Sequence, residues 1–120
     1  MTVVVCSADD LAPGEKRALR VGRRNVVVVR AADGRYWAVA DICPHQGAQL
    51  SAGHLGGRLV FADGACTVER EGEILRCPWH NFAFDVTTGR NLLEPERYRV
   101  ATYRVTVQNG NVVLPDLGDQ

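Results

Sequence analysis

The chain has 120 residues, and its 14 Lys and Arg balance 14 Asp and Glu, so the formal net charge is zero at pH 7. This length predicts a single domain, and a hydrophobic share of 46% with a charged share of 23% excludes disordered, collagen-like and coiled-coil chains. There is no run of like charges to bind nucleic acid or an anionic membrane, and no apolar stretch approaches the roughly 18 residues of a membrane span.

Residues 1–5 lack both a basic segment and a long apolar segment, so we do not expect a secretory signal there. We therefore expect a cytoplasmic protein. In a reducing compartment, metal or redox chemistry explains four cysteines better than structural disulfides do.

Short β-branched runs bounded by turn residues fill the first third of the chain, and no window shows a helical stripe. The pattern predicts strands at residues 2–6, 16–21, 25–30 and 36–40, with a loop at 9–15 and a hairpin connection at Asp33-Gly34. Val26 to Val29 show no alternation, which predicts a strand covered on both faces. The fold class is all-β.

Two further hairpins are predicted later in the chain. Glu71-Gly72 lies between runs at residues 67–70 and 73–76, and Asn109-Gly110 lies between runs at 103–108 and 111–114. Asn-Gly is the stronger signal because both residues suit a type I′ turn. Residues 115–120 are expected to be a frayed tail.

Two short clusters combine sulfur and nitrogen donors: Cys43-Pro44-His45 and Cys77-Pro78-Trp79-His80, separated by residues 46–76. Two thiolates and two imidazoles admit either a tetrahedral zinc site or a two-iron cluster with both cysteines on one iron and both histidines on the other. Proline after each cysteine stiffens both loops. Trp79 and Phe82 would supply apolar cover beside the second pair.

The stretch from Asp41 to Leu50 with Gly53, and the stretch from Leu75 to Asp85 ending at Gly89, resemble both halves of the cluster motif of the Rieske [2Fe-2S] family. The resemblance implies an antiparallel β-sandwich, with a single Rieske domain over residues 1–120 and a small cluster-binding subdomain at about 42–89. It also implies a [2Fe-2S] cluster held by a ligand set of four residues: Cys43, His45, Cys77 and His80.

Four departures from the motif indicate which branch of the family the chain resembles. Ala48 and Trp79 stand where membrane-complex members carry a disulfide, and Phe82 and Phe84 stand where they carry hydroxyl donors to the cluster. Fewer hydrogen bonds to the sulfurs predict a reduction potential toward the low end of the roughly −150 to +300 mV range. The chain thus resembles the soluble, ferredoxin-type branch.

Two further departures concern the loops themselves. Asn81 replaces the usual Gly, and Asn is the residue next best able to adopt a left-handed conformation. The spacer between the two clusters is long, and we expect residues from about 55 to 71 to form an elongated loop that leads into a hairpin strand.

The resemblance implies a one-electron carrier between a flavin reductase and a terminal oxygenase or similar acceptor, not an enzyme. An oxygenase iron needs two histidines and a carboxylate, and only His54 remains once the cluster is served. No nucleophile and base pair or phosphate-binding loop is present. The alternatives are a small subunit of a nitrite reductase type of enzyme and a zinc-stabilised binding module.

The remaining candidate residues have plainer interpretations. Cys6 is expected to be a small buried hydrophobe and Cys66 a packing residue, with a disulfide between them as a minor alternative. His54 is expected on an exposed loop. Tyr36 and Trp37 are interpreted as edge and core residues.

Overall fold

The computed structural model describes residues 2–44, 47–79 and 82–115. In chain order its elements are β1 (Thr2–Ser7), the 3-10 turn η1 (Ala8–Asp10), β2 (Lys16–Val21), β3 (Arg24–Arg30), β4 (Tyr36–Ala40), the 3-10 turn η2 (Leu50–Ala52), β5 (His54–Ala62), β6 (Ala65–Arg76), β7 (Ala83–Asp85), β8 (Arg90–Asn91), β9 (Thr102–Tyr103), β10 (Thr106–Gln108) and β11 (Asn111–Pro115). Within these ranges there is no α-helix, and no helix is long and apolar enough to cross a membrane.

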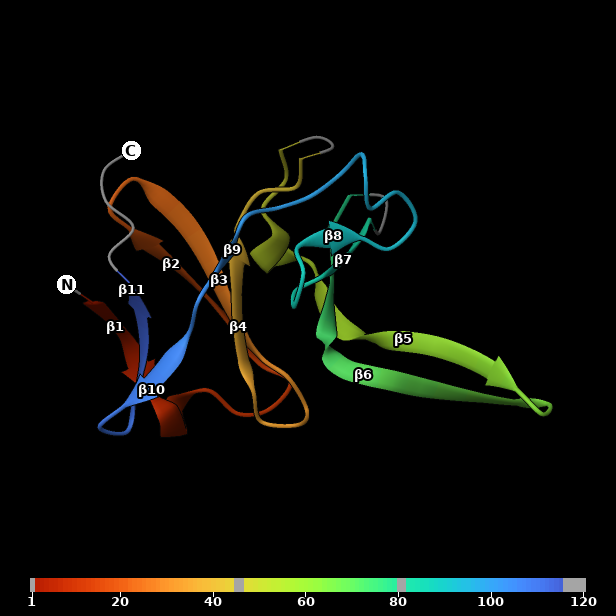
Figure 1. Cartoon of the computed structure of the whole chain (residues 1–120), viewed down its shortest axis with the longest axis horizontal. Coiled ribbons are helices and arrows are strands. Elements are labelled where there is room, and N and C mark those ends of the chain that lie inside the picture. Colours follow the sequence, from red (N-terminus) through yellow and green to blue (C-terminus); the bar gives the residue numbers. More distant parts are fainter. Residues whose placement is uncertain (1, 45–46, 80–81, 116–120) are drawn as a thin grey trace.

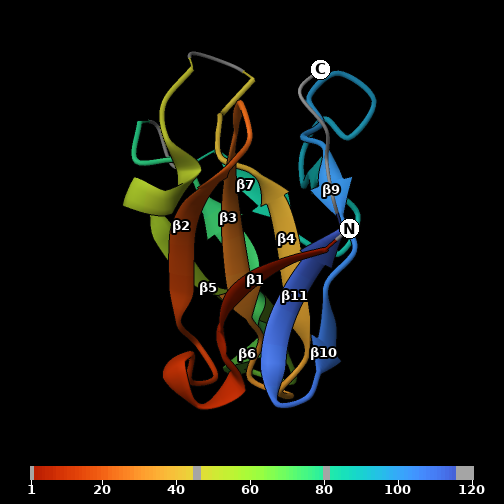
Figure 2. The same cartoon turned by 90° about the vertical axis from the view of Figure 1, so that its left-hand side faces the viewer.

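The strands form three antiparallel sheets that lie in layers (Figures 1 and 2). The sheet β1-β11-β10 lies on one side of the sheet β2-β3-β4-β9, and the sheet β5-β6-β7-β8 lies on its other side. This arrangement confirms the predicted all-β class, an antiparallel β-sandwich with a smaller sheet.

Strand β3 is the centre of the molecule because both of its faces are covered. Val26 and Val28 pack with Leu11, Val112 and Leu114 in one core, whereas Val27 and Val29 belong to a second core shared with the smaller sheet. All four valines are fully buried, as the absence of alternation predicts.

The predicted hairpin at Asn109-Gly110 joins β10 to β11. Both residues have positive φ, 54° and 77°, as a type I′ turn requires. Gly34, with φ of 91°, connects β3 to β4. These turns follow directly from the local sequence.

The hairpin predicted at Glu71-Gly72 is wrong. Residues 65–76 form one continuous strand, β6, and the chain reverses instead at Asp63-Gly64, whose φ values of 52° and 76° also fit a type I′ turn. Gly72 has a positive φ too, but there it bends β6 against Ala31 rather than reversing the chain.

The elongated loop expected around residues 55–71 is likewise wrong, because these residues lie within the paired strands β5 and β6. We call residues 58–69 the outer ribbon; it is paired in register from Arg58 and Glu69 to Ala62 and Ala65. Figure 1 shows it projecting away from the rest of the molecule, whose principal extents are 50 × 31 × 21 Å.

Candidate metal centre

The first cysteine loop follows β4 and is closed by its own backbone. The N–H of Cys43 donates to the carbonyl of Ala48 at 2.8 Å, and the N–H of Gly47 donates to the carbonyl of Cys43 at 2.7 Å. Gly47 has φ of 79°, a conformation that glycine adopts without steric cost. The loop therefore holds Cys43 with its side chain turned into the core, where the residue is 1% exposed.

Asp41 fixes the exit of this loop. Its carboxylate accepts hydrogen bonds from the backbone N–H of Ser51 at 2.7 Å and from the Ser51 hydroxyl at 2.6 Å. Asp41 is almost fully buried, so these bonds replace the water it loses. The pair ties the end of β4 to η2 across the loop.

The second cysteine loop connects β6 to β7. The N–H of Cys77 donates to the carbonyl of Phe82 at 2.8 Å, which closes the loop. Cys77 is as deeply buried as Cys43. A methyl group on Gly53 would collide with the carbonyl of Arg76, so the exit of the first loop packs directly on the start of the second.

The two loops bring the two thiols into contact. Burial raises the pKa of the Cys77 thiol, and a hydrogen bond with the Cys43 side chain raises it further. A hydrogen bond with the backbone of Trp79 lowers this pKa but does not outweigh the other two effects. Neither cysteine is in a disulfide. Two adjacent, buried, unpaired thiols form a donor pair suited to a thiophilic metal such as iron or zinc.

His45 and His80 lie outside the described residues. Among the described residues no group of three or more His, Cys, Asp and Glu side chains could hold a metal ion. The two thiols are therefore the part of the expected ligand set that the structure describes, and they fit the sulfur half of a two-iron cluster.

Aromatic side chains pack in and against the core that contains the two thiols. The rings of Phe82 and Phe84 meet edge to face with centroids 6.0 Å apart, and Phe82 meets Tyr98 in the same way at 4.9 Å. Phe84 is fully buried in the core that contains both cysteines, and Phe82 and Tyr98 pack against it. No local pattern in the sequence indicates this role of Tyr98.

An ion-pair network joins β6 to β7 next to the second loop, and no local pattern in the sequence indicates it. The Arg70 guanidinium contacts the Asp85 carboxylate (Nη1 to Oδ2, 2.8 Å) and the Glu73 carboxylate (Nη2 to Oε1, 2.9 Å). Thr87 donates to Asp85 through its hydroxyl at 2.6 Å and its N–H at 2.9 Å. The network fixes the start of the turn that ends at Gly89, whose N–H donates to the Asp85 carbonyl at 2.7 Å.

The charge state of Asp85 follows from these contacts. Burial alone would raise its pKa, but hydrogen bonds from Arg70 and Thr87, with the attraction of the Arg70 charge, outweigh burial and hold the pKa below its usual value. The hydrogen bond to Asp85 in turn raises the pKa of Arg70. Both groups stay charged at neutral pH.

The other candidate residues lie away from the thiols. Cys6 is buried in β1, as predicted, and is not bonded to Cys66. Cys66 is exposed in the outer ribbon, so the expectation of a packing residue is wrong. His54 is exposed, as predicted, but it begins β5 instead of lying in a loop.

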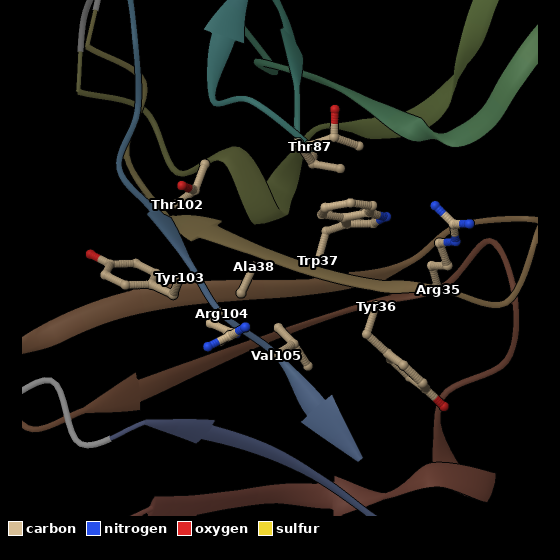
Figure 3. Close-up of a pocket in the computed structure, with 10 residues that line it drawn as sticks. Arg35, Tyr36, Trp37, Ala38, Thr87, Thr102, Tyr103, Arg104 and Val105 are labelled. Carbon is tan, nitrogen blue, oxygen red and sulfur yellow. The ribbon is translucent and has the colours of Figure 1, made fainter.

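A cavity of about 500 Å³ opens beside β4 and β9 (Figure 3). The described residues that line it include Trp37, Thr87 and Tyr103 but no cysteine, histidine or carboxylate. Trp37 is half-buried against the core and has a buried Nε1 without a hydrogen-bond partner among the described residues. The cavity is therefore separate from the two cysteine loops.

Comparisons with known proteins agree with this geometry. A family model described as "Rieske [2Fe-2S] domain" matches residues 1–104. Ferredoxin CarAc of Metapseudomonas resinovorans is 33% identical, over 92% of this chain and 89% of its own length. The ferredoxin component of the alkene monooxygenase system of Xanthobacter autotrophicus is 31% identical, over 93% of this chain and 79% of its own.

Solved structures show the same similarity. A chain in the complex of reduced oxygenase and oxidized ferredoxin in carbazole 1,9a-dioxygenase matches with a TM-score of 0.72 and 31% identity, covering 93% of this chain and 99% of that chain. A structure titled as a putative NADH-dependent nitrite reductase small subunit from Mycobacterium tuberculosis matches with a TM-score of 0.75 over 98% of this chain and 96% of that one. At 23% identity, that second likeness extends to the fold alone.

Proposed function

The chain belongs to the Rieske [2Fe-2S] family, and from that premise we propose that it carries single electrons from a flavin-containing reductase to a terminal oxygenase or a similar acceptor. Relatives that match more than nine-tenths of the chain are named as ferredoxin components of a dioxygenase system and of a monooxygenase system, which are electron carriers and not the catalytic enzymes. The observation that carries the proposal is the contact between two buried thiols where the two loops meet.

We propose that Cys43, His45, Cys77 and His80 hold the [2Fe-2S] cluster that the family implies. When bound, such a cluster supplies the reversible uptake and release of one electron. The adjacent thiols of Cys43 and Cys77 support the sulfur half of this set. For the histidines the support is sequence alone, because each lies within three residues of its cysteine.

The residues around the thiols would exclude water and set the potential. Leu50, Leu75 and Phe84 are fully buried in the core that contains the cysteines, so the medium on that side is apolar. Phe82 and Phe84 offer no hydroxyl to the sulfurs. We therefore propose a potential at the low end of the Rieske range.

Two exposed apolar side chains mark where a redox partner would dock. Ile42, one residue before Cys43, is 53% exposed, and Trp79, two residues after Cys77, is 52% exposed. Exposed aromatic and aliphatic groups of this kind are typical of the centre of a protein interface. Their place in the two loops would bring a partner close to the thiols.

We further propose one domain over residues 1–120, with a cluster-binding subdomain at about 42–89, in a cytoplasmic protein. The core that contains Val27 and Val29 of β3 also contains Leu75 and Phe84 of the smaller sheet, which supports a single unit. The four unpaired cysteines support a reducing compartment.

The test is an electron paramagnetic resonance spectrum of the dithionite-reduced protein, together with iron and acid-labile sulfide analysis and a redox titration. Mixed sulfur and nitrogen ligation is expected to lower the average g value relative to an all-cysteine cluster, and the midpoint should be low. Colourless protein that contains zinc and no sulfide would overturn the cluster, and a clearly positive midpoint would overturn the low potential.

A further inference from the structure

Three arginines gather where β2 turns into β3. Arg20 lies near the end of β2, Arg23 lies in the turn and Arg24 begins β3. Arg20 and Arg23 are exposed and Arg24 is half-buried. Among the described residues no carboxylate forms an ion pair with any of the three. We call residues 20–24 the arginine turn.

The arginine turn has a fixed shape. Val21 and Arg24 face each other in the ladder, so only Gly22 and Arg23 connect the two strands. Gly22 has φ of 62°, which suits the first position of a type II′ turn. Its carbonyl accepts a hydrogen bond from Nε of Arg20 at 3.1 Å, so the Arg20 side chain is held at the turn.

The arginine turn lies beside the first cysteine loop. The N–H of Asp41, where that loop starts, donates to the carbonyl of Asn25 at 2.9 Å. A hollow of about 330 Å³ lies between them, with Arg24 and Asn25 in one wall and Ile42 and Gly47 in the other. Figure 2 shows the connection of β2 to β3 and the loop after β4 at the same end of the molecule. The positive charge is therefore adjacent to the loop that holds the first thiol.

Nearby carboxylates do not cancel this charge. Asp41 also lines the hollow, but it is 4% exposed and accepts both hydrogen bonds from Ser51. One buried carboxylate against three arginines leaves an excess of positive charge. Glu94 and Glu96, in the loop before β9, each pair with an arginine at 3.6 and 3.5 Å. A chain of zero formal net charge thus presents a positive surface beside its first cysteine loop.

The Arg24 guanidinium lacks good acceptors. Its Nε is buried without a hydrogen-bond partner among the described residues, and its Nη1 has only a long contact of 3.5 Å with the Tyr103 hydroxyl. A carboxylate can accept charge-assisted hydrogen bonds from the outer nitrogens of a guanidinium, and such bonds are about twice as strong as neutral ones. The chemistry of the hollow therefore suits a carboxylate.

We propose that the arginine turn recognises an acidic surface on the redox partner, and that a carboxylate of that partner enters the hollow against Arg24. This rests on the proposed function, because the partner must exchange electrons at the cysteine loops. Ile42 borders the hollow and is 53% exposed, so the same contact brings apolar surface of the partner onto Ile42. Charged groups around such a contact speed encounter and select the partner.

An acidic protein surface fits better than nucleic acid. The affinity of a protein for nucleic acid grows with the number of phosphates that it neutralises. Here three arginines lie at a single turn, and one of them faces a hollow rather than an extended track. A compact cluster of this kind matches a few carboxylates on a folded partner.

Oxidation of the dithionite-reduced, cluster-loaded chain by two small probes of opposite charge tests the sign of this surface. The probes are the trianion trisoxalatocobaltate(III) and the trication hexaamminecobalt(III), each of which takes one electron, followed by stopped-flow absorption. R23E should lower the ratio of the trianion to the trication rate constant at least about 10-fold at an ionic strength of about 0.01 M. The ratio is used because a change in reduction potential alters both rate constants in the same direction.

The effect of R23E should disappear near 1 M salt, where the Debye length is about 3 Å. R20E should act in the same direction as R23E. The matched control is R35E, which makes the same change of charge at a residue whose side chain is 75% exposed. Arg35 lies in the connection of β3 to β4, at the other end of β3 (Figure 1), so R35E should leave the ratio within about 2-fold.

Hexaglutamate, as a probe of an acidic partner surface, tests the hollow. It should slow the reaction of the wild type with the trianion, and R24Q should need at least about 5-fold more peptide for the same effect, because it removes the charge that the carboxylate meets. Circular dichroism and the visible spectrum verify that each variant is folded and loaded.

Three results would overturn the proposal: the same ratio in R23E and R35E, equal slowing of R24Q and the wild type by hexaglutamate, and equal slowing by a DNA duplex at the same concentration of negative charge. The last would show general binding of polyanions. A chain that takes up no electron from dithionite would overturn the carrier function and this proposal together. A chain that carries electrons without regard to the charge of the probe overturns the proposal alone.

Discussion

Strand β6 passes through two environments, and its two halves show what the rest of the molecule contributes to a strand. Near its C-terminal end, Leu75 is fully buried in the core that contains Cys43 and Cys77, whereas Val68 in the outer ribbon is 53% exposed. The inner half packs under other layers, and the outer half has only its partner strand. A two-stranded hairpin alone is marginally stable in water, so the inner half should carry the stability of the fold and the metal centre, and the outer half neither.

The largest expected effect is on cluster content, and it distinguishes Cys77, directly after the inner half of β6, from Cys66 in the outer half. C77S should reduce bound iron and acid-labile sulfide to background, because serine does not replace a thiolate ligand, whereas C66S in the outer ribbon should retain the full content. Iron and sulfide analysis with visible absorption measures both. Retention of the cluster by C77S, or its loss from C66S, would contradict the assignment.

The next effect compares two apolar residues of β6. L75A should lower the free energy of unfolding by about 2–5 kcal/mol, because it leaves a cavity in a packed core. V68A removes exposed surface and should change it by no more than about 0.5 kcal/mol. Urea unfolding of the cluster-loaded chains, followed by circular dichroism, gives both values. Equal losses would show that the outer ribbon belongs to the same packed unit.

Two glycines with positive φ, Gly64 in the outer ribbon and Gly72 at its base, should differ in how much stability an alanine substitution costs. Gly64 in the turn of the ribbon has open space where a Cβ would lie, so G64A should cost only the roughly 1–2 kcal/mol of the left-handed conformation. Gly72 faces the backbone of Ala31, so G72A should cost about 1–3 kcal/mol more. The difference between their urea midpoints is the measurement, and a larger loss in G64A would refute the account of the bend in β6.

The smallest effect concerns pH. The pKa of Asp85 in the folded chain lies below the value of about 3.9 for an unfolded aspartate. The contribution of Asp85 to stability is therefore complete above about pH 5 and is lost as the pH falls through the folded pKa. D85N should cost about 1–2 kcal/mol at pH 7, a modest value because Arg70 is one-third exposed.

D85N should also flatten the fall in stability of the wild type below about pH 5. The control is D33N, because Asp33 pairs with Arg35 on the surface, where the Oδ2 to Nε distance is 3.7 Å. Urea midpoints at several pH values test both variants. If D33N flattens the profile as much as D85N does, the buried pair is not the source of the effect.

Much of this organisation could be predicted from local sequence. The unbroken run of Val26 to Val29 indicates a strand buried on both faces, and Asn109-Gly110 fixes its own hairpin, because in both cases adjacent residues carry the information. The two Cys-Pro clusters indicate where a metal donor pair forms, and the structure brings Cys43 and Cys77 together.

The errors arose where distant contacts decide the local conformation. Asp63-Gly64 and Glu71-Gly72 both have the composition of a turn, and only the packing of Gly72 on Ala31, 41 positions earlier, makes the second a bend inside a strand. The same holds for Arg70, whose contact with Asp85 becomes visible only when β6 and β7 pair. The exposure of Cys66 follows from the reversal at Asp63-Gly64, which places it near the tip of a projecting hairpin.

The close packing of Gly53 on Arg76 has a consequence for recognising related chains. Both ends of the β5–β6 hairpin meet at this point, so the distance in sequence between the two cysteine loops measures only how far the hairpin reaches. Adding or removing residues in cross-strand pairs would change that number without moving either thiol. A search pattern that fixes the interval between the half-motifs would therefore overlook chains with an identical centre and a hairpin of another length.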